Sequence, residues 1–222
     1  MTPIICTVDI VLLTLRSNKL HVALLKREQE PFAGMFALPG GYVHSEQDRD
    51  VQDAAARVLL EKTGFVSPYL EQLATFSGPA RDPRGWSVSV VYYALVPEEI
   101  ILNQTSIKLL PVEGLKGLPF DHQHVVETAV ARLRSKSTYS SLPVYLCEPL
   151  FTLPHLQEVY EAVLGEPINK VSFRRKMKVL AMVEAVDGVM EAGKANRPAK
   201  LYRLKKEFKN SLSLLNRAFN AG

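Results

Sequence analysis

Residues 39–65, PGGYVHSEQDRDVQDAAARVLLEKTGF, contain the pattern that decides the fold of the first part of the chain. Their apolar residues recur at i, i+3, i+4, i+7 and i+8, which is one face of an α-helix. These residues are Val51, Ala54, Ala55, Val58 and Leu59. Asp50 is suited to cap the start of the helix and Gly64 to end it. The sequence therefore predicts a Gly-Gly turn at Gly40-Gly41 followed by an amphipathic helix.

This tract resembles the Nudix box, in which a Gly-Gly turn leads into a helix whose Arg-Glu-x-x-Glu-Glu run presents carboxylates to divalent metal. Counting back from Gly64, that run falls on Arg57, Val58, Glu61 and Lys62. Magnesium needs hard, anionic oxygen ligands, and diphosphate hydrolysis needs the metal to neutralise charge and activate water. One carboxylate beside an ammonium supplies neither. We therefore expect no catalytic residues, no bound metal and no other cofactor.

Two alternatives remain open for this tract. The stretch between Gly41 and Arg57 is two residues longer than the Nudix pattern and places Arg49 where an upstream glutamate is expected, although Glu46, Asp48 and Asp50 are nearby carboxylates. The chain could then be an active ADP-ribose pyrophosphatase with an appended nucleic-acid-binding domain. An ordinary amphipathic core helix explains residues 51–63. It does not explain residues 38–41 and 61–64 together.

The composition is that of a globular protein, with 47% hydrophobic and 23% charged residues. No apolar run approaches the roughly 20 residues that span a bilayer, and the N-terminus lacks a basic signal segment. We expect a cytoplasmic protein without a membrane partner. Residues 1–148 hold 14 Lys+Arg and 16 Asp+Glu, whereas residues 149–222 hold 13 and 7. The basic charge therefore belongs to the last third, which favours a polyanion partner, although solvated lysines would also produce it.

The first 145 residues show a mixed α/β pattern. Strands are predicted at residues 4–15 and 20–26, joined by a Ser17-Asn18 hairpin turn, and at residues 69–76 and 86–95. A helix is predicted at residues 123–134. This order agrees with the α/β/α sandwich that the Nudix resemblance implies. Residues 135–152 shift to Ser, Thr and Pro and predict a partly packed boundary. We expect an effector-sensing domain over residues 1–145 and a second domain over residues 150–222.

The second domain begins with two predicted helices. Thr152 is suited to cap the first, Pro154 lies in its first turn, and Gly165 ends it. The second spans about residues 170–182 and turns Phe173, Met177 and Leu180 inward. Its opposite face carries Val171, Arg174, Arg175 and Lys178. That profile is typical of a recognition helix in a major groove.

Two strands are predicted next, at residues 183–190 and 199–203, joined by a tip at residues 191–198. A basic hairpin after a basic helix is typical of the wing of a winged helix, whose cations approach phosphates or the minor groove. The candidate DNA-binding residues are Ser172, Arg174, Arg175, Lys178, Lys194 and Arg197. The alternatives are a solvated basic face and an RNA-binding protein. Residues 204–219 have one apolar helical side, which we expect to dock on a neighbouring element or a second subunit.

A loop at residues 80–86, Ala-Arg-Asp-Pro-Arg-Gly-Trp, separates two predicted strands in the first domain. Arginine forks suit pyrophosphate, and Phe36 or Trp86 could stack on a base. An ordinary type I turn with solvent-facing arginines is the alternative. The candidate ligand-binding residues are Phe36, Gly40, Gly41, Glu61, Arg81, Arg84 and Trp86. We expect His44, His122 and His124 to be surface loop histidines.

The Arg-Asp-Pro-Arg-Gly run, at this distance from the box, is similar to the Nudix-related transcriptional regulators of NAD metabolism, the NrtR family. The resemblance covers nearly the whole chain, from residues 38–41 to the wing at residues 197–199. It implies a homodimeric repressor of NAD biosynthesis or salvage genes that leaves double-stranded operator DNA on binding ADP-ribose or a related NAD-derived nucleotide. Related branches sense sugars, which keeps a sugar effector as an alternative.

Overall fold

The computed structural model describes residues 3–102, 104–190 and 199–208, which form two compact units. The first unit comprises Met1–Arg16 and Leu20–Arg132, and the second comprises Ser17–Lys19 and Leu133–Gly222. Each unit is described by itself. In the part of the chain described, no helix has the length and apolarity that crossing a membrane requires.

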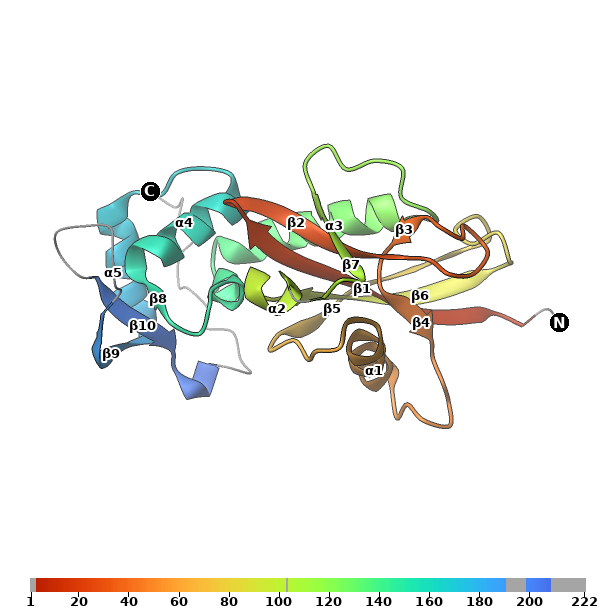
Figure 1. Ribbon diagram of the computed structural model, residues 1–222, viewed down its shortest axis with the longest axis horizontal. Coiled ribbons are helices and arrows are strands. Elements are labelled where there is room, and N and C mark those ends of the chain that lie inside the picture. The colour runs from red at the N-terminus through yellow and green to blue at the C-terminus, as the bar shows by residue number, and fades with distance from the viewer. Residues whose placement is uncertain (1–2, 103, 191–198, 209–222) are drawn as a thin grey trace. The chain divides into compact units, whose positions relative to one another are not determined.

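A mixed seven-stranded sheet forms the centre of the first unit (Figure 1). Its main path runs β3-β2-β1-β6-β5, with β4 paired to β1 and β7 paired to β2. The strands are β1 (Ile5–Arg16), β2 (Lys19–Lys26), β3 (Phe36–Ala37), β4 (Gly40–Tyr42), β5 (Leu70–Gly78), β6 (Ser87–Leu95) and β7 (Ile107–Pro111). The central pair, β1 and β6, is parallel, and β5 pairs antiparallel with β6. The four strands predicted from sequence are confirmed within two residues at each end.

The connection between β1 and β2 is a two-residue turn at Ser17 and Asn18, as predicted. Their φ angles are 50° and 57°. Positive φ at both positions gives the turn a twist that matches two paired strands, and asparagine tolerates this conformation.

Helix α1 (Val51–Thr63) covers one face of the sheet. The Asp50 side chain accepts hydrogen bonds from the backbone amides of Gln52 and Asp53, and Gly64, with a φ of 78°, donates its N–H to the Leu60 carbonyl. Both caps are as predicted. The apolar side of α1 packs on alternate residues of β1, namely Val8, Ile10 and Leu12.

Helix α3 (His122–Ser137) lies on the opposite side of the sheet, and α2 (Glu98–Leu102) follows β6 (Figure 1). The predicted α/β/α sandwich is therefore confirmed. The prediction for α3 began one residue late and ended three residues early.

The Gly-Gly turn expected at Gly40-Gly41 is wrong. Both residues lie in β4, where Gly40 pairs with Asp9 and Gly41 with Val8, and neither has a positive φ. Glycine is needed for close approach instead of for turning. A Cβ added to Gly40 would lie 2.2 Å from Asp9 Oδ1, and one added to Gly41 would lie 2.9 Å from Val58 Cγ2.

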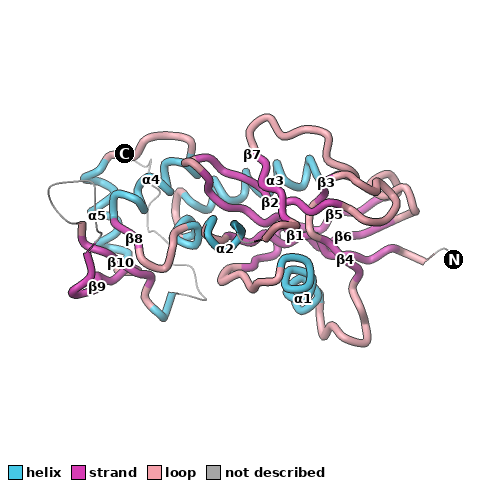
Figure 2. Tube along the Cα trace, viewed as in Figure 1, coloured by secondary structure: helices cyan, strands magenta, loops and turns pink. Residues whose placement is uncertain are grey.

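The second unit contains helices and a three-stranded sheet of order β8-β10-β9 (Figure 2). After the end of α3 come the 3-10 helix η1 (Leu142–Leu146), β8 (Phe151–Thr152), α4 (Leu153–Leu164), α5 (Lys170–Leu180), β9 (Val183–Met190), β10 (Lys200–Leu204) and the 3-10 helix η2 (Lys206–Phe208). Thr152 accepts a hydrogen bond from the His155 amide, and Gly165 ends α4 with a φ of 79°. The helix, helix and hairpin order is the one predicted for a winged helix.

Two elements in the second unit have boundaries that differ from prediction. Helix α5 ends at Leu180 instead of residue 182, because Ala181 takes a φ of 47° and its N–H bonds to the Met177 carbonyl. Strand β10 spans Lys200–Leu204 instead of residues 199–203. The hairpin tip at residues 191–198 and residues 209–219 of the helix predicted at residues 204–219 lie outside the described residues. In the described part of that prediction, Leu204 ends β10 and Lys206–Phe208 form the 3-10 helix η2.

Residues 135–152 are packed within the second unit. All five residues of η1 are buried, and the Tyr160 hydroxyl donates to the Ser140 carbonyl at 3.0 Å. The first unit ends at Arg132 by its internal contacts, whereas the predicted boundary region begins at residue 135. Burial of the apolar residues that intervene between the serines and prolines makes this segment part of the second core.

Candidate functional site

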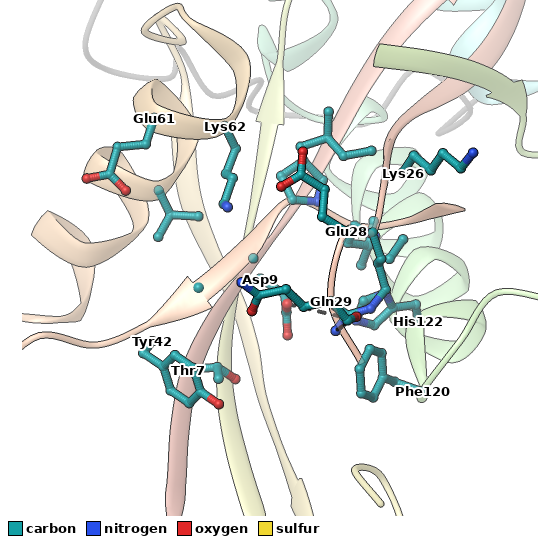
Figure 3. Close-up of a pocket in the computed structure, with 18 of the residues that line it drawn as sticks. Thr7, Asp9, Lys26, Glu28, Gln29, Tyr42, Glu61, Lys62, Phe120 and His122 are labelled. Atoms are coloured by element: carbon teal, nitrogen blue, oxygen red, sulfur yellow. Dashed lines mark hydrogen bonds and ion pairs between the residues drawn. The ribbon is translucent and has the colours of Figure 1, made fainter. Parts of the chain in front are cut away.

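A pocket of about 1100 Å³ opens in the first unit between α1 and the chain that follows β2 (Figure 3). Glu61 and Lys62 of α1 lie on one side, and Glu28, Phe120 and His122 lie on the other. Strand β4, Asp9 of β1 and the loop residues Arg81, Asp82 and Arg84 also line it. Ligand pockets typically measure about 300–1,000 Å³, so the volume of this pocket suits a ligand at the upper end of the small-molecule size range.

The pocket brings together six of the seven residues predicted to bind ligand. Its lining includes Phe36, Gly40, Gly41, Glu61, Arg81 and Arg84. Trp86 is outside the lining, and its side chain is 45% exposed. Of the two aromatic residues predicted to stack on a base, Phe36 is therefore the one that lines the pocket. The Lys108 ammonium lies over its ring, 4.5 Å from the centroid.

Arg81 is held by carboxylates of the protein itself. Its Nε and Nη2 donate to the two carboxylate oxygens of Asp121 at 2.9 Å each, and its Nη1 donates to Ser87 Oγ at 3.3 Å. Asp9 Oδ2 lies 3.7 Å from Nη2. The Arg81 side chain is 9% exposed. The expected fork is present, but an incoming phosphate must compete with Asp121 for it.

Arg84 is bound within its own loop and remains more accessible. Its Nε and Nη2 donate to Asp82 at 3.0 and 2.7 Å, and its Nη1 donates to the Tyr42 hydroxyl at 2.6 Å. The hydrogen bonds that Arg84 donates to Asp82 raise the pKa of Arg84. The Gly85 amide donates to the Asp82 carbonyl at 3.2 Å, so the turn considered as the alternative is present and orients Arg84.

A buried polar cluster at the base of the pocket was missed from sequence. His122 was expected on the surface, but it is 4% exposed, and its Nδ1 accepts the Leu38 amide at 3.1 Å. Burial lowers the pKa of His122. Its Nε2 lies 3.8 Å from Asp9 Oδ1, and Asp9 Oδ2 accepts from Ser89 Oγ at 2.6 Å. His44 and His124 are exposed, as expected, but His124 lies in α3 instead of in a loop.

The carboxylates that could have replaced lost metal ligands have other partners. Arg57 Nε and Nη2 each donate to Asp48 at 2.7 Å, and this lowers the pKa of Asp48 to about 2. Arg57 Nη1 also donates to Glu61 at 3.2 Å. Asp50 caps α1, and Arg49 pairs with Asp53.

The divalent metal of the Nudix box pattern does not fit this donor set. Val58, at the first ligand position of the box, is 1% exposed within the apolar core. Glu61 is bonded to Arg57, and Lys62 is a cation. Across residues 3–102, 104–190 and 199–208, no group of three or more His, Cys, Asp or Glu side chains is arranged to hold a metal ion.

Helix α5 in the second unit displays the predicted basic face. Phe173, Met177 and Leu180 are buried, whereas Arg174, Arg175 and Lys178 are exposed. Asn169 caps the helix by accepting the Val171 and Ser172 amides at 3.0 Å each, and Ser172 is half-buried. Lys194 and Arg197 lie outside the described residues. The two strands of the hairpin, β9 and β10, are linked by Arg203, which donates to Glu184 at 2.7 Å.

An α/β/α unit with a polar pocket, joined in one chain to a winged helix with a basic helix face, defines a ligand-responsive DNA-binding regulator. Family models agree with this class. Residues 7–130 match the NUDIX domain, and residues 143–204 match the NrtR DNA-binding winged helix domain.

Individual proteins are similar over most of the chain. The ADPR responsive transcriptional repressor NtrR of Acinetobacter baylyi is 43% identical over 203 residues, 89% of this chain and 80% of the relative. The crystal structure of Shewanella oneidensis NrtR complexed with a 27mer DNA superposes with a TM-score of 0.89 at 37% identity, covering 96% and 98% of the two chains. Its NUDIX domain complexed with ADP ribose superposes with a TM-score of 0.54 at 37% identity, covering 60% and 90%.

The chain belongs to the NrtR family of Nudix-related transcriptional regulators. The family resemblance found from sequence is confirmed, and so is the order of the two folds.

Proposed function

We propose that this protein is a homodimeric repressor that binds operator DNA through α5 and releases it when ADP-ribose, or a related NAD-derived nucleotide, enters the pocket of the first unit. NAD biosynthesis or salvage genes are the proposed targets. The observation that carries the proposal is one chain holding both a large cation-lined pocket and a capped helix with an exposed basic face.

The pocket chemistry favours a nucleotide diphosphate over a sugar. Arg81, Arg84 and Lys62 line the same space, and guanidinium forks match phosphate oxygens. A diphosphate attracts these cations by its charge as well as by hydrogen bonds, whereas a neutral sugar offers hydrogen bonds alone. Phe36 offers an aromatic face for a base.

We also propose that the pocket binds this nucleotide without hydrolysing it. The support is the donor set, in which Val58 and Lys62 replace carboxylates and Asp48 is occupied by Arg57. The rival function is an ADP-ribose pyrophosphatase. Incubating the protein with ADP-ribose and millimolar magnesium or manganese distinguishes the two, because turnover near the usual enzyme median of about 10 s⁻¹ would establish the rival.

Effector and operator must oppose each other for release to occur. A ligand shifts a protein between two forms only by its difference in affinity for them, and the coupling is reciprocal. Helix α3 begins at the pocket-lining His122 and continues to Ser137, which is in the second unit. This continuous helix, with the packed segment that follows it, is the element we propose to transmit occupancy.

The test is a binding titration with labelled duplexes from the region upstream of the protein's own gene and its neighbours. We expect specific binding to a palindrome with half-sites about one or two helical turns apart. ADP-ribose should weaken it some 5- to 150-fold, the usual range of allosteric coupling. Arg174→Ala with Arg175→Ala should lose the specific complex. The control Lys116→Ala removes an exposed charge from the first unit and should not. If the affinity for the operator does not change when ADP-ribose is added, the proposed effector is wrong, although the protein would still be a DNA-binding protein.

A further inference from the structure

The arginines around the pocket have their charges or donors engaged by the protein itself. Arg57 is bonded to Asp48, Arg81 to Asp121 and Arg84 to Asp82. Arg27 donates to backbone carbonyls, and its guanidinium lies 4.8 Å from the Phe120 ring centroid. A ligand phosphate therefore competes with an existing contact at each of them.

Lys62 differs from these arginines. It is exposed, it lines the pocket, and it forms no ion pair with any of the residues the structure describes. Figure 3 shows its ammonium directed into the pocket, whereas the neighbouring Glu61 carboxylate points away from it. Glu61 is also engaged by Arg57. The last turn of α1 therefore presents a cation to the pocket.

Lys62 occupies the position at which the Nudix box pattern places a metal-binding carboxylate. A carboxylate there serves phosphates indirectly, by holding a divalent cation. An ammonium can contact phosphate oxygens directly, with three donors on a flexible stem. It also repels a divalent cation from the same place.

We propose that Lys62 is a ligand-binding residue whose ammonium replaces a metal ion, so that the pocket binds a nucleotide diphosphate without divalent metal. This inference rests on the proposed function, because it assumes a diphosphate effector. The box helix then keeps its phosphate-binding role while its charge is supplied by the chain itself. Sequence reasoning treated Lys62 only as the loss of a ligand and did not include it among the binding residues.

The experiment is calorimetric titration of the full-length protein with ADP-ribose, first with EDTA and then with millimolar magnesium chloride. We expect the dissociation constant of the wild type to differ by less than about twofold between the two buffers. Lys62→Gln should weaken binding about 10- to 150-fold, the size of one lost hydrogen bond to a charged group. Lys62→Arg should retain most of the affinity, because it restores the charge.

The matched control is Lys26→Gln. Lys26 is also an exposed lysine in the lining of the pocket, but Figure 3 shows its ammonium directed outward. We expect this variant to bind as the wild type does. Inorganic pyrophosphate, titrated in parallel, should lose affinity in Lys62→Gln as ADP-ribose does, which assigns the contact to the phosphates.

The outcomes separate this inference from the proposed function. A wild type that binds no ADP-ribose in either buffer contradicts the proposed effector. A wild type that binds only with magnesium overturns the inference about Lys62 alone. Equal affinity of the wild type and Lys62→Gln overturns it as well, provided that the two proteins melt at the same temperature.

Discussion

Arg81 and Asp121 are joined by two parallel hydrogen bonds of 2.9 Å across 40 residues of sequence. The pair links the loop before β6 to the residue preceding α3, and Asp9 of β1 lies 3.7 Å from the same guanidinium. A diphosphate that takes Arg81 must displace part of this arrangement, immediately before the first residue of α3. If the proposed effector binds Arg81, its binding is therefore coupled to the position of the α3 N-terminus in the first unit.

Arg81→Ala is expected to destabilise the protein as well as weaken effector binding. Removing the cation leaves Asp121 without its arginine. Breaking a fully buried pair costs roughly 3–5 kcal/mol, and because the Asp121 side chain is 23% exposed, we expect a smaller loss here. The measurement is the free energy of unfolding by urea. Arg81→Ala with Asp121→Asn should recover part of the loss because it removes one uncompensated charge. Loss of effector response without loss of stability would show that the pair is not buried in solution.

The contribution of Asp48 to the free energy of unfolding should decrease at acidic pH. The hydrogen bonds from Arg57 lower its pKa to about 2 in the folded protein, against about 3.9 in an unfolded chain. A depressed folded pKa means that the contribution is complete above about pH 4 and is lost as pH falls toward 2. The difference in unfolding free energy between the wild type and Asp48→Asn should therefore shrink across this window. A difference that stays constant from pH 5 to 2.5 would contradict the pairing.

Gly40→Ala should disturb the pocket more than Gly41→Ala. A Cβ at Gly40 would meet Asp9 Oδ1 at 2.2 Å, whereas at Gly41 it would meet a Val58 methyl group at 2.9 Å. Asp9 is tied to Ser89, so it has less freedom to move away. Overpacking of this kind costs roughly 1–3 kcal/mol. Thermal melts of the two variants test the order, and an equal effect would mean that the Asp9 cluster rearranges freely.

Local signals in the sequence were sufficient for the long elements of both units, but not for the short strands β3, β4, β7 and β8 or for helix α2. The caps of α1 and α4 and the Ser17-Asn18 turn depend on neighbouring residues, so their chemistry can be recognised without a fold. The basic face of α5 likewise follows from helical spacing. The end of α5 was missed because Ala181 has no side chain that marks a left-handed cap.

Long-range contacts explain what was missed in the pocket. Ser89 and Asp9 are 80 residues apart, and His122 is 84 residues from the Leu38 amide that it accepts. No periodicity brings such residues together. The same reason explains why the ion pair of Arg81 with Asp121 was missed, although its guanidinium was recognised as a candidate phosphate-binding group. That pair depends on the parallel pairing of β1 with β6 and on where α3 begins.

Val171 should contact a thymine in the operator. It lies one turn before Arg175 on the exposed face of α5 and is 75% exposed, although valine favours neither solvent nor helix. The methyl group of thymine is the apolar feature that the major groove offers to such a side chain. Replacing single thymines by deoxyuridine, in an operator selected from random duplexes, removes one methyl group and keeps every hydrogen bond. Where the replaced thymine is the one that Val171 contacts, the wild type should lose about 0.8 kcal/mol of binding free energy, or roughly fourfold in affinity for the duplex. The affinity of Val171→Ala should not change with the same replacement.

The control Val66→Ala changes a valine that is 72% exposed in the first unit, and it should behave as the wild type. If no thymine distinguishes the wild type from Val171→Ala, the valine makes no base contact, whereas specific binding by Arg174 and Arg175 would remain intact.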